Sequence, residues 1–130
     1  ISSWQGANLQ SNQVLTKLQH MPDATTAKIA ALNDHARQTF GECRVVITQG
    51  VSELGKCDVA YILDKVRKYK DFTPINDPYF EHDFGSIQLG ENTIFWKIDY
   101  YDIDLQMHSP DPSDPAVTTR ILTIMLAEEY

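Results

Sequence analysis

Residues 84–101 read FGSIQLGENTIFWKIDYY and decide the fold of this chain. Two runs with alternating apolar side chains flank a Gly-Glu-Asn turn, a pattern typical of a β-hairpin with strands at 84–89 and 93–101. Successive side chains of a strand point to opposite faces of the sheet, so one face of the second strand is large and apolar. We expect that face to lie in the core, and it consists of Ile94, Trp96, Ile98 and Tyr100.

Three further elements are predicted before the hairpin. Asp23 is a good N-cap, and the apolar spacing after it predicts a helix over 24–39 that ends before Gly41. The run RVVIT at 44–48 is rich in β-branched residues and predicts a short buried strand. A stripe of apolar residues with helical spacing predicts a second helix over 57–69.

The segment after the hairpin begins with a proline-rich loop and ends in a long apolar run. Asp114 followed by Pro115 suits the start of a helix, because Asp caps helices and Pro is tolerated at the first helical position. We therefore predict a third helix over 115–128. Its apolar side chains cover more than half of its circumference and are Val117, Ile121, Leu122, Ile124, Met125 and Leu126.

Together these elements describe a single α+β domain over 23–130. We expect a small, mostly antiparallel sheet of three strands, with the helices packed mainly on one face. At 130 residues the chain has the ordinary length of one domain. Residues 1–22 are rich in Gln, Asn and Ser, so we expect a flexible or marginally helical N-terminal arm there.

The composition points to a folded, acidic protein. No stretch approaches the roughly 18 apolar residues that cross a bilayer, and two cysteines cannot form a multi-bridge framework, so we expect a cytoplasmic protein. The formal net charge is −7, and residues 71–114 hold ten acidic residues against Lys97 alone. Nucleic acids and anionic membranes bind cationic surfaces. We therefore expect neither as a direct ligand.

The acidic residues gather around one end of the hairpin. With the turn at 90–92, Asp83 is expected opposite Asp99, beside the Glu81-His82-Asp83 run. Like charges directly opposite each other destabilise a sheet, so this cluster needs a compensating charge. The candidates are Lys97, His82, Arg120 from the predicted last helix, a bound cation or a basic partner.

Known catalytic and metal-binding motifs match this sequence poorly. Asp102-x-Asp104 begins like a calcium-binding loop, but the glycine and glutamate that such a loop needs further on are missing. No nucleophile elbow and no glycine-rich phosphate loop is present, and no cofactor is expected. One enzymatic alternative stays open, a metal-dependent hydrolase or nuclease whose ligands are Glu81, His82, Asp83 and Asp99.

Three runs carry a resemblance to a known family: NDPYFEHDFG (76–85), FWKIDYYD (95–102) and SPDPSDPAVTTRILTIMLAEEY (109–130). In these runs, and over roughly 43–130, the chain resembles a bacterial domain-of-unknown-function family, family 3768. The resemblance implies a small bacterial protein of the kind often encoded by proteobacterial plasmids and other mobile elements. It implies no catalytic residue.

The leading hypothesis is a non-enzymatic binding protein, with the metal-dependent enzyme and a structural protein without an active site as alternatives. The partner would be a basic host protein or nucleoprotein complex, and the resemblance makes inhibition of host defence by DNA mimicry one form of this function. We expect a monomer or a homodimer. The predicted binding surface consists of Asp77, Tyr79, Glu81, His82, Asp83, Lys97, Asp99, Tyr101, Asp102 and Asp104.

Overall fold

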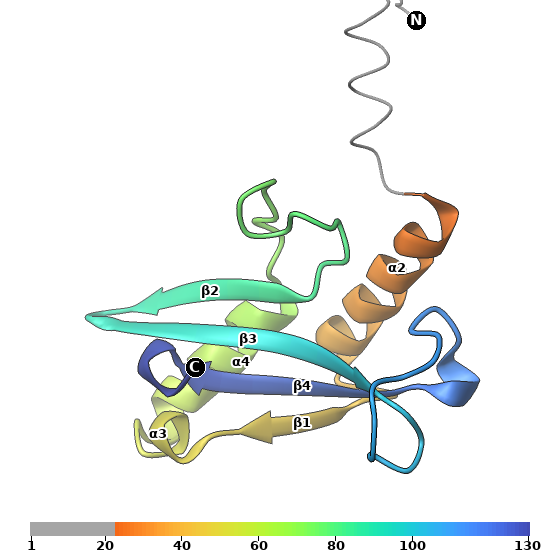
Figure 1. Cartoon of the computed structure of the whole chain (residues 1–130). Helices are drawn as coiled ribbons and strands as arrows, with labels where there is room; N and C mark the ends of the chain where they lie inside the picture. Colours follow the sequence, from red (N-terminus) through yellow and green to blue (C-terminus); the bar gives the residue numbers. More distant parts are fainter. Residues whose placement is uncertain (1–22) are drawn as a thin grey trace, which may run out of the picture.

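A computed structural model of the chain describes residues 23–130, so the predicted N-terminal arm lies outside the described residues. Figure 1 shows the strands running side by side in one twisted sheet. In chain order the elements are α2 (Ala24–Thr39), β1 (Arg44–Ile47), α3 (Gln49–Ser52), α4 (Lys56–Arg67), β2 (Phe84–Leu89), β3 (Asn92–Tyr101), the 3-10 turn η1 (Pro115–Val117), β4 (Thr119–Leu126) and the 3-10 turn η2 (Ala127–Glu129).

The hairpin and the two longer helices are confirmed. Strands β2 and β3 pair antiparallel around a two-residue turn in which Gly90 has a φ of 59°, a conformation that glycine adopts without strain. The register differs by one residue from the prediction, since Phe84 pairs with Lys97 and the Ile98 amide donates to the Asp83 carbonyl at 2.9 Å. Asp83 therefore lies opposite Ile98 and not opposite Asp99.

The predicted helix at 115–128 is wrong. Asp114 does cap a turn, because its carboxylate accepts from the Ala116 amide at 2.9 Å, but this turn ends at Val117. From Thr119 the chain forms β4, a strand between β1 and β3. A continuous apolar run does not distinguish a buried strand from a buried helix, and the β-branched residues at 119, 121, 123 and 124 favour the strand.

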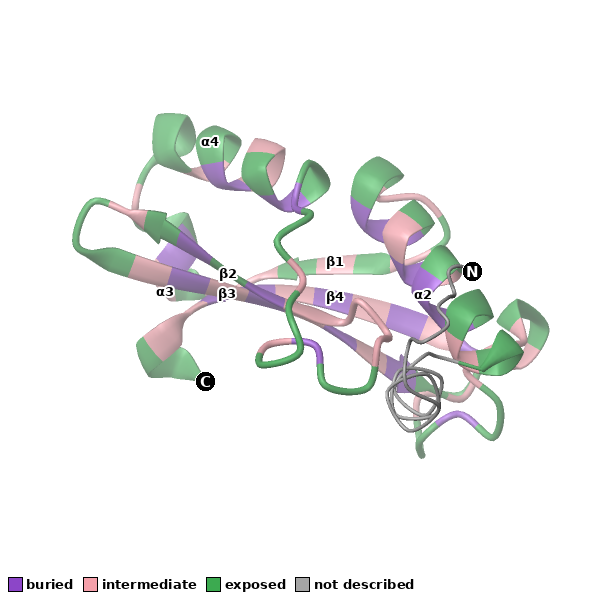
Figure 2. Cartoon of the chain, turned by 90° about the horizontal axis from the view of Figure 1, so that it is seen from above, coloured by how far each residue is buried: buried purple, intermediate pink, exposed green. Residues whose placement is uncertain are grey.

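The sheet is therefore mixed and has four strands instead of three. Its strand order is β1-β4-β3-β2, with β1 parallel to β4 and the other neighbours antiparallel. Helices α2 and α4 lie on the same side of this sheet (Figure 2), as predicted. We call the opposite side the open face. Among residues 23–130, no helix combines the length and the apolar composition that a membrane crossing requires.

The core lies between the sheet and the two helices. Trp96 and Ile94 of β3, Ile124 of β4 and Ile62 of α4 are fully buried, which confirms the predicted core face of the hairpin. Gly85 makes this packing possible. A Cβ atom at that position would lie 2.3 Å from the Trp96 Nε1 atom and 2.7 Å from the Tyr69 ring, far closer than atoms can approach.

Candidate functional site

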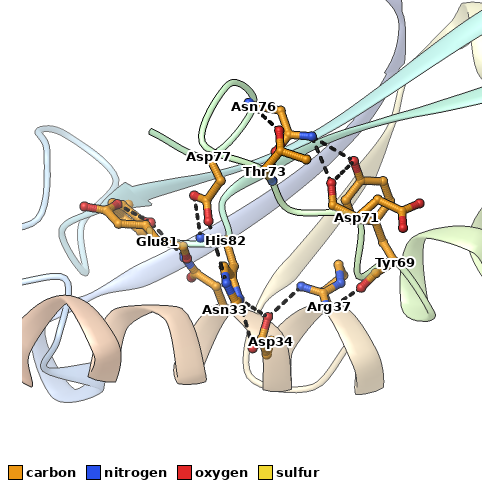
Figure 3. Close-up of polar contacts among 11 residues, drawn as sticks. Asn33, Asp34, Arg37, Tyr69, Asp71, Thr73, Asn76, Asp77, Glu81 and His82 are labelled. Carbon is orange, nitrogen blue, oxygen red and sulfur yellow. Dashed lines mark hydrogen bonds and ion pairs between the residues drawn. The ribbon is translucent and has the colours of Figure 1, made fainter. Parts of the chain in front are cut away.

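The loop between α4 and β2, residues 68–83, lies over α2 and carries half of the predicted binding residues (Figure 3). Two of its residues, Phe80 and His82, have left-handed φ values of 62° and 55°. This conformation costs a non-glycine residue roughly 1–2 kcal/mol. The cost is offset by fixed contacts, since the buried Asn33 amide donates to the Glu81 carbonyl at 2.9 Å. The backbone around Glu81 is therefore held in place from α2.

His82 is held between two carboxylates. Its Nδ1 atom lies 3.0 Å from the Asp34 Oδ1 atom and its Nε2 atom lies 3.6 Å from the Asp77 Oδ2 atom. The ring stacks on Phe72 with centroids 4.0 Å apart, and the His82 amide donates to Asp77 at 3.1 Å. Both ring nitrogens therefore face carboxylate oxygens, and the closer contact is the one to Asp34 on α2. His82 thus joins the loop to α2.

Asn33 connects the loop to β3 and β4 in the interior. Its amide nitrogen donates to the Tyr100 hydroxyl at 2.8 Å, and its carbonyl oxygen accepts from the Arg120 Nε atom at 2.7 Å. The Tyr100 hydroxyl donates in turn to Glu81 at 2.8 Å. Burial, and then the bond to Glu81, raise the pKa of the Tyr100 phenol. Arg120, predicted as a compensating charge for the acidic cluster, is therefore linked to Glu81 by a chain of hydrogen bonds through Asn33 and Tyr100.

Arg37 of α2 is the second buried arginine of the site, after Arg120 of β4, and is 1% exposed. It pairs with Asp34 at 2.9 Å and donates to the Tyr69 carbonyl at 3.1 Å. Its guanidinium carbon lies 5.3 Å from the centroids of both the Phe72 and Trp96 rings. Because the same Asp34 carboxylate also faces His82, the charges of α2 and of the loop are linked. We call the linked side chains the polar network, which consists of Asn33, Asp34, Arg37, Asp77, Glu81, His82, Tyr100 and Arg120.

Asp83 has the most perturbed carboxyl group of the predicted surface. Its pKa is raised to about 6, first by burial, then by the charge of Glu81 and more weakly by those of Asp77 and Asp99. Within residues 23–130 no cation pairs with Asp83 or Glu81, and Lys97 pairs with Asp99 at 2.9 Å. A concentration of negative charge around Asp83 is therefore left without a direct partner.

The structure divides the predicted binding residues into two groups. Asp77, Glu81 and His82 belong to the polar network, and Asp77 is buried, with 4% of its surface exposed. The other group consists of Lys97, Asp99 and Tyr101 on the open face of β3, Asp102 and Asp104 in the turn after β3, and the strongly exposed Tyr79. Asp83 lies between the groups, close enough to sense both Glu81 and Asp99.

The proposed metal ligands are not brought together. Glu81 accepts from Tyr100, His82 faces Asp34 and Asp77, and Asp99 pairs with Lys97. In the described part of the chain, no group of three His, Cys, Asp or Glu side chains could hold a metal ion. The ligand set Glu81, His82, Asp83 and Asp99 is therefore not supported by the geometry.

Sequence reasoning missed the α2 members of the polar network. Asn33 and Arg37 lie on the same side of α2 as the buried Ile29 and Ala36, so they occupy core positions of that helix. Polar residues at helical core positions are a recognisable signal, because buried polar groups need internal partners. Apart from Asp34, which pairs with Arg37 one turn away, their hydrogen-bond partners lie 32 to 87 residues away in the chain, which no local pattern specifies.

These features define a class of small α+β proteins, in which a mixed four-stranded sheet is covered on one face and a buried polar network fixes an acidic loop. The chain belongs to the family described as "Protein of unknown function (DUF3768)", whose model matches residues 47–129. No curated protein and no solved structure matches the chain. The matched residues include the acidic loop and all of the hairpin, and they begin after α2.

Proposed function

We propose that this protein is a non-enzymatic binding protein that engages a basic protein partner. The observation that carries the proposal is that Glu81 and Asp83 lie near each other and, within residues 23–130, neither pairs with a cation. Burial and the charge of Glu81 raise the pKa of Asp83 to about 6. The contact surface would be formed by charged residues and two exposed tyrosines. We call it the acidic surface, and it consists of Tyr79, Glu81, Asp83, Asp99, Tyr101, Asp102 and Asp104.

The electrostatics of Asp83 favour a cationic ligand. A raised carboxyl pKa means that the ionised form is disfavoured in the free protein, and an approaching Lys or Arg side chain would reverse this effect. Binding would then release protons near pH 6, because a group that is partly protonated in the free protein would ionise in the complex. The polar network supports the proposal, since a surface held in one conformation loses little entropy on binding.

Exposed aromatic and apolar side chains beside the charges support a protein as the partner. Tyr79 is 78% exposed, Ile103 is 56% exposed and Tyr101 is 37% exposed. Tyrosines are enriched at the energetic centres of protein interfaces, where they add buried area to the contribution of the charges. A small ion would make no use of these side chains, whereas a basic protein would.

The resemblance to plasmid-borne proteins suggests which basic partners to test first. A nucleoprotein complex of host defence has a cationic groove for nucleic acid, and a DNA mimic would occupy that groove. Alternate residues of a strand are about 6.6 Å apart, roughly twice the axial distance of about 3.4 Å between phosphates of one DNA strand. Competition with duplex DNA for the captured partner would separate mimicry from binding elsewhere on that partner.

A capture experiment tests the proposal. The full chain is immobilised, and proteins of a proteobacterial lysate are captured at low and at high salt. We expect a partner that is lost at high salt and lost in the double variant Asp99→Lys with Asp102→Lys. The matched control is Asp58→Lys with Glu91→Lys, which makes the same charge change at exposed positions outside the acidic surface. Absence of a partner at low salt, or equal capture by both double variants, would refute the proposal.

A further inference from the structure

A second surface, which is positively charged, lies along the outer edge of β2. Helix α4 and strand β2 enclose a groove of about 310 Å³, lined among others by Tyr61, Lys65, Lys68 and Lys70 on one side and by Ser86 and Gln88 on the other. Three lysines around one groove stand out in a chain with a net charge of −7. The groove shares no residue with the acidic surface, so a ligand of the groove is independent of the proposed function.

One side of the groove is the unpaired edge of the sheet. Strand β2 is the last strand of the order and pairs only with β3. The Ile98 amide donates to the Asp83 carbonyl, so Asp83 and every second residue after it point their backbone groups toward β3. Phe84, Ser86 and Gln88 therefore point their N–H and C=O groups outward. Such an edge can accept a further strand.

The lysines are available to a ligand. Within residues 23–130, Lys65 and Lys70 form no ion pair, and the Lys65 Nζ atom lies 5.3 Å from the centroid of the Tyr61 ring. Lys68 pairs with Asp64 at 3.2 Å, but the side chains are 74% and 48% exposed. An exposed pair of this kind contributes little and is easily exchanged for another carboxylate. The groove also contains one acidic residue, Asp71, which leaves an excess of positive charge.

We infer that this groove binds an extended acidic segment of a protein partner, which adds to β2 as a fifth strand. The backbone of the segment would bond to the outward groups of Ser86 and Gln88. Every second side chain of an added strand faces the helix layer. There Lys65 in the last turn of α4, and Lys68 and Lys70 just after that helix, line the groove. Carboxylates at alternate positions, about 6.6 Å apart, would meet Lys65 and Lys68, whose Cα atoms are about 4.5 Å apart along the helix axis. The long lysine side chains cover the difference.

A synthetic peptide tests this inference on the full chain. The probe is an eight-residue peptide that alternates glutamate with threonine or valine, labelled for fluorescence anisotropy, and its control contains lysine in place of glutamate. We expect saturable binding of the glutamate peptide only, with NMR shifts of the Ser86 and Gln88 amides. A third peptide, methylated at alternate backbone nitrogens on the edge that faces β2, should bind at least tenfold more weakly. It leaves the protein unchanged, so its result does not depend on the folding of a variant.

Charge reversal on the protein completes the test. Lys65→Glu with Lys68→Glu should weaken binding at least tenfold, whereas Lys56→Glu, an exposed position at the other end of α4, should not change it. Circular dichroism confirms that each variant is folded. Equal binding of the lysine and glutamate peptides, no binding at millimolar concentration, or equal binding of the methylated peptide would overturn the inference. Binding of a duplex oligonucleotide in place of the peptide would overturn it too.

Discussion

Asn33 is the residue on which most of the polar network depends. It is fully buried, and its amide joins three elements through bonds to the Glu81 carbonyl, Tyr100 and Arg120. A buried hydrogen-bonding group that loses its partner costs more than the bond itself contributes, because its desolvation is no longer compensated. Removal of one amide therefore affects a carbonyl, a phenol and a guanidinium together.

Asn33→Ala should lower the free energy of unfolding by about 2 to 3 kcal/mol, since it leaves three buried partners with unmet bonds. Urea unfolding followed by tryptophan fluorescence measures the change, and the fully buried Trp96 is a suitable reporter of the core. The control is Gln38→Ala, an exposed position on the same helix, which should shift stability by less than about 0.5 kcal/mol. Equal effects of the two substitutions would show that the Asn33 bonds are not important for stability.

Asp83 makes stability depend on pH in the opposite direction to an ion-paired aspartate. Its pKa is about 6 in the folded protein, against roughly 3.9 in an unfolded chain. The folded state therefore binds this proton more tightly. As a result, the contribution of Asp83 to the free energy of unfolding falls as pH rises from about 4 to about 6, and is constant above that.

Asp83→Asn should abolish the loss of stability that Asp83 causes as pH rises. At neutral pH the variant should be more stable than the wild type by about 1 to 2 kcal/mol, a value reduced from the full pKa difference because the side chain is partly exposed. Near pH 4 the two proteins should be equally stable. Urea unfolding at both pH values measures the difference, with the exposed turn variant Glu91→Gln as the control. A constant difference between Asp83→Asn and wild type at both pH values would contradict the assignment.

At the scale of elements, the close approach of the loop, α4 and the sheet depends on Gly85. The space that a side chain would need at this position is filled by Trp96 and by Tyr69, the latter just beyond the end of α4. Gly85→Ala should therefore cost about 1 to 3 kcal/mol through overpacking, whereas Ser86→Ala, on the exposed side of the same strand, should be nearly neutral. Urea unfolding of both variants measures this, and an equally small effect of Gly85→Ala would show that the ring positions can shift.

The elements that local patterns predict correctly are those with a clear period. The hairpin alternates with period two around a glycine turn, and α2 has both a cap and helical spacing, with Asp23 accepting from the Thr26 amide at 2.7 Å. Strand β4 has no such distinguishing period in its sequence, because large apolar residues occur on both of its faces, with Leu122 and Ile124 on one and Ile121 and Met125 on the other. It also lies between two other strands. Asp114 and Pro115 do start a helical turn, but it is the single 3-10 turn η1 and not a long helix. Whether such a segment forms a strand or a helix depends on the elements that surround it, and these are a property of the whole fold.

The candidate site shows the same limit, because its contacts depend on tertiary neighbours that local sequence patterns do not specify. The acidic run 81–83 and its position beside β3 could be predicted from the hairpin pattern, but the one-residue difference in register could not. The side chains that support the loop come from α2, distant in sequence from 68–83. Sequence therefore indicated where the charge gathers, whereas the tertiary structure determines which carboxylates are already bonded and which are left without a partner.

At the scale of the whole molecule, charge is separated between two surfaces. The acidic surface lies where β2 begins and β3 ends, and the lysine groove lies between α4 and the outer edge of β2. A protein with two surfaces of opposite charge can engage a basic partner and an acidic segment at the same time. Charge reversal in the groove should therefore leave capture by the acidic surface unchanged, which the lysate experiment tests directly with the Lys65→Glu and Lys68→Glu variant.

One measurement tests most directly whether a basic partner neutralises the acidic surface. The carboxyl carbon of Asp83 is followed by NMR during a pH titration, first in the free protein and then in the complex with the captured partner. We predict a pKa of about 6 in the free protein and a fall toward the ordinary aspartate value in the complex. An Asp83 pKa that is the same with and without the partner would contradict the account.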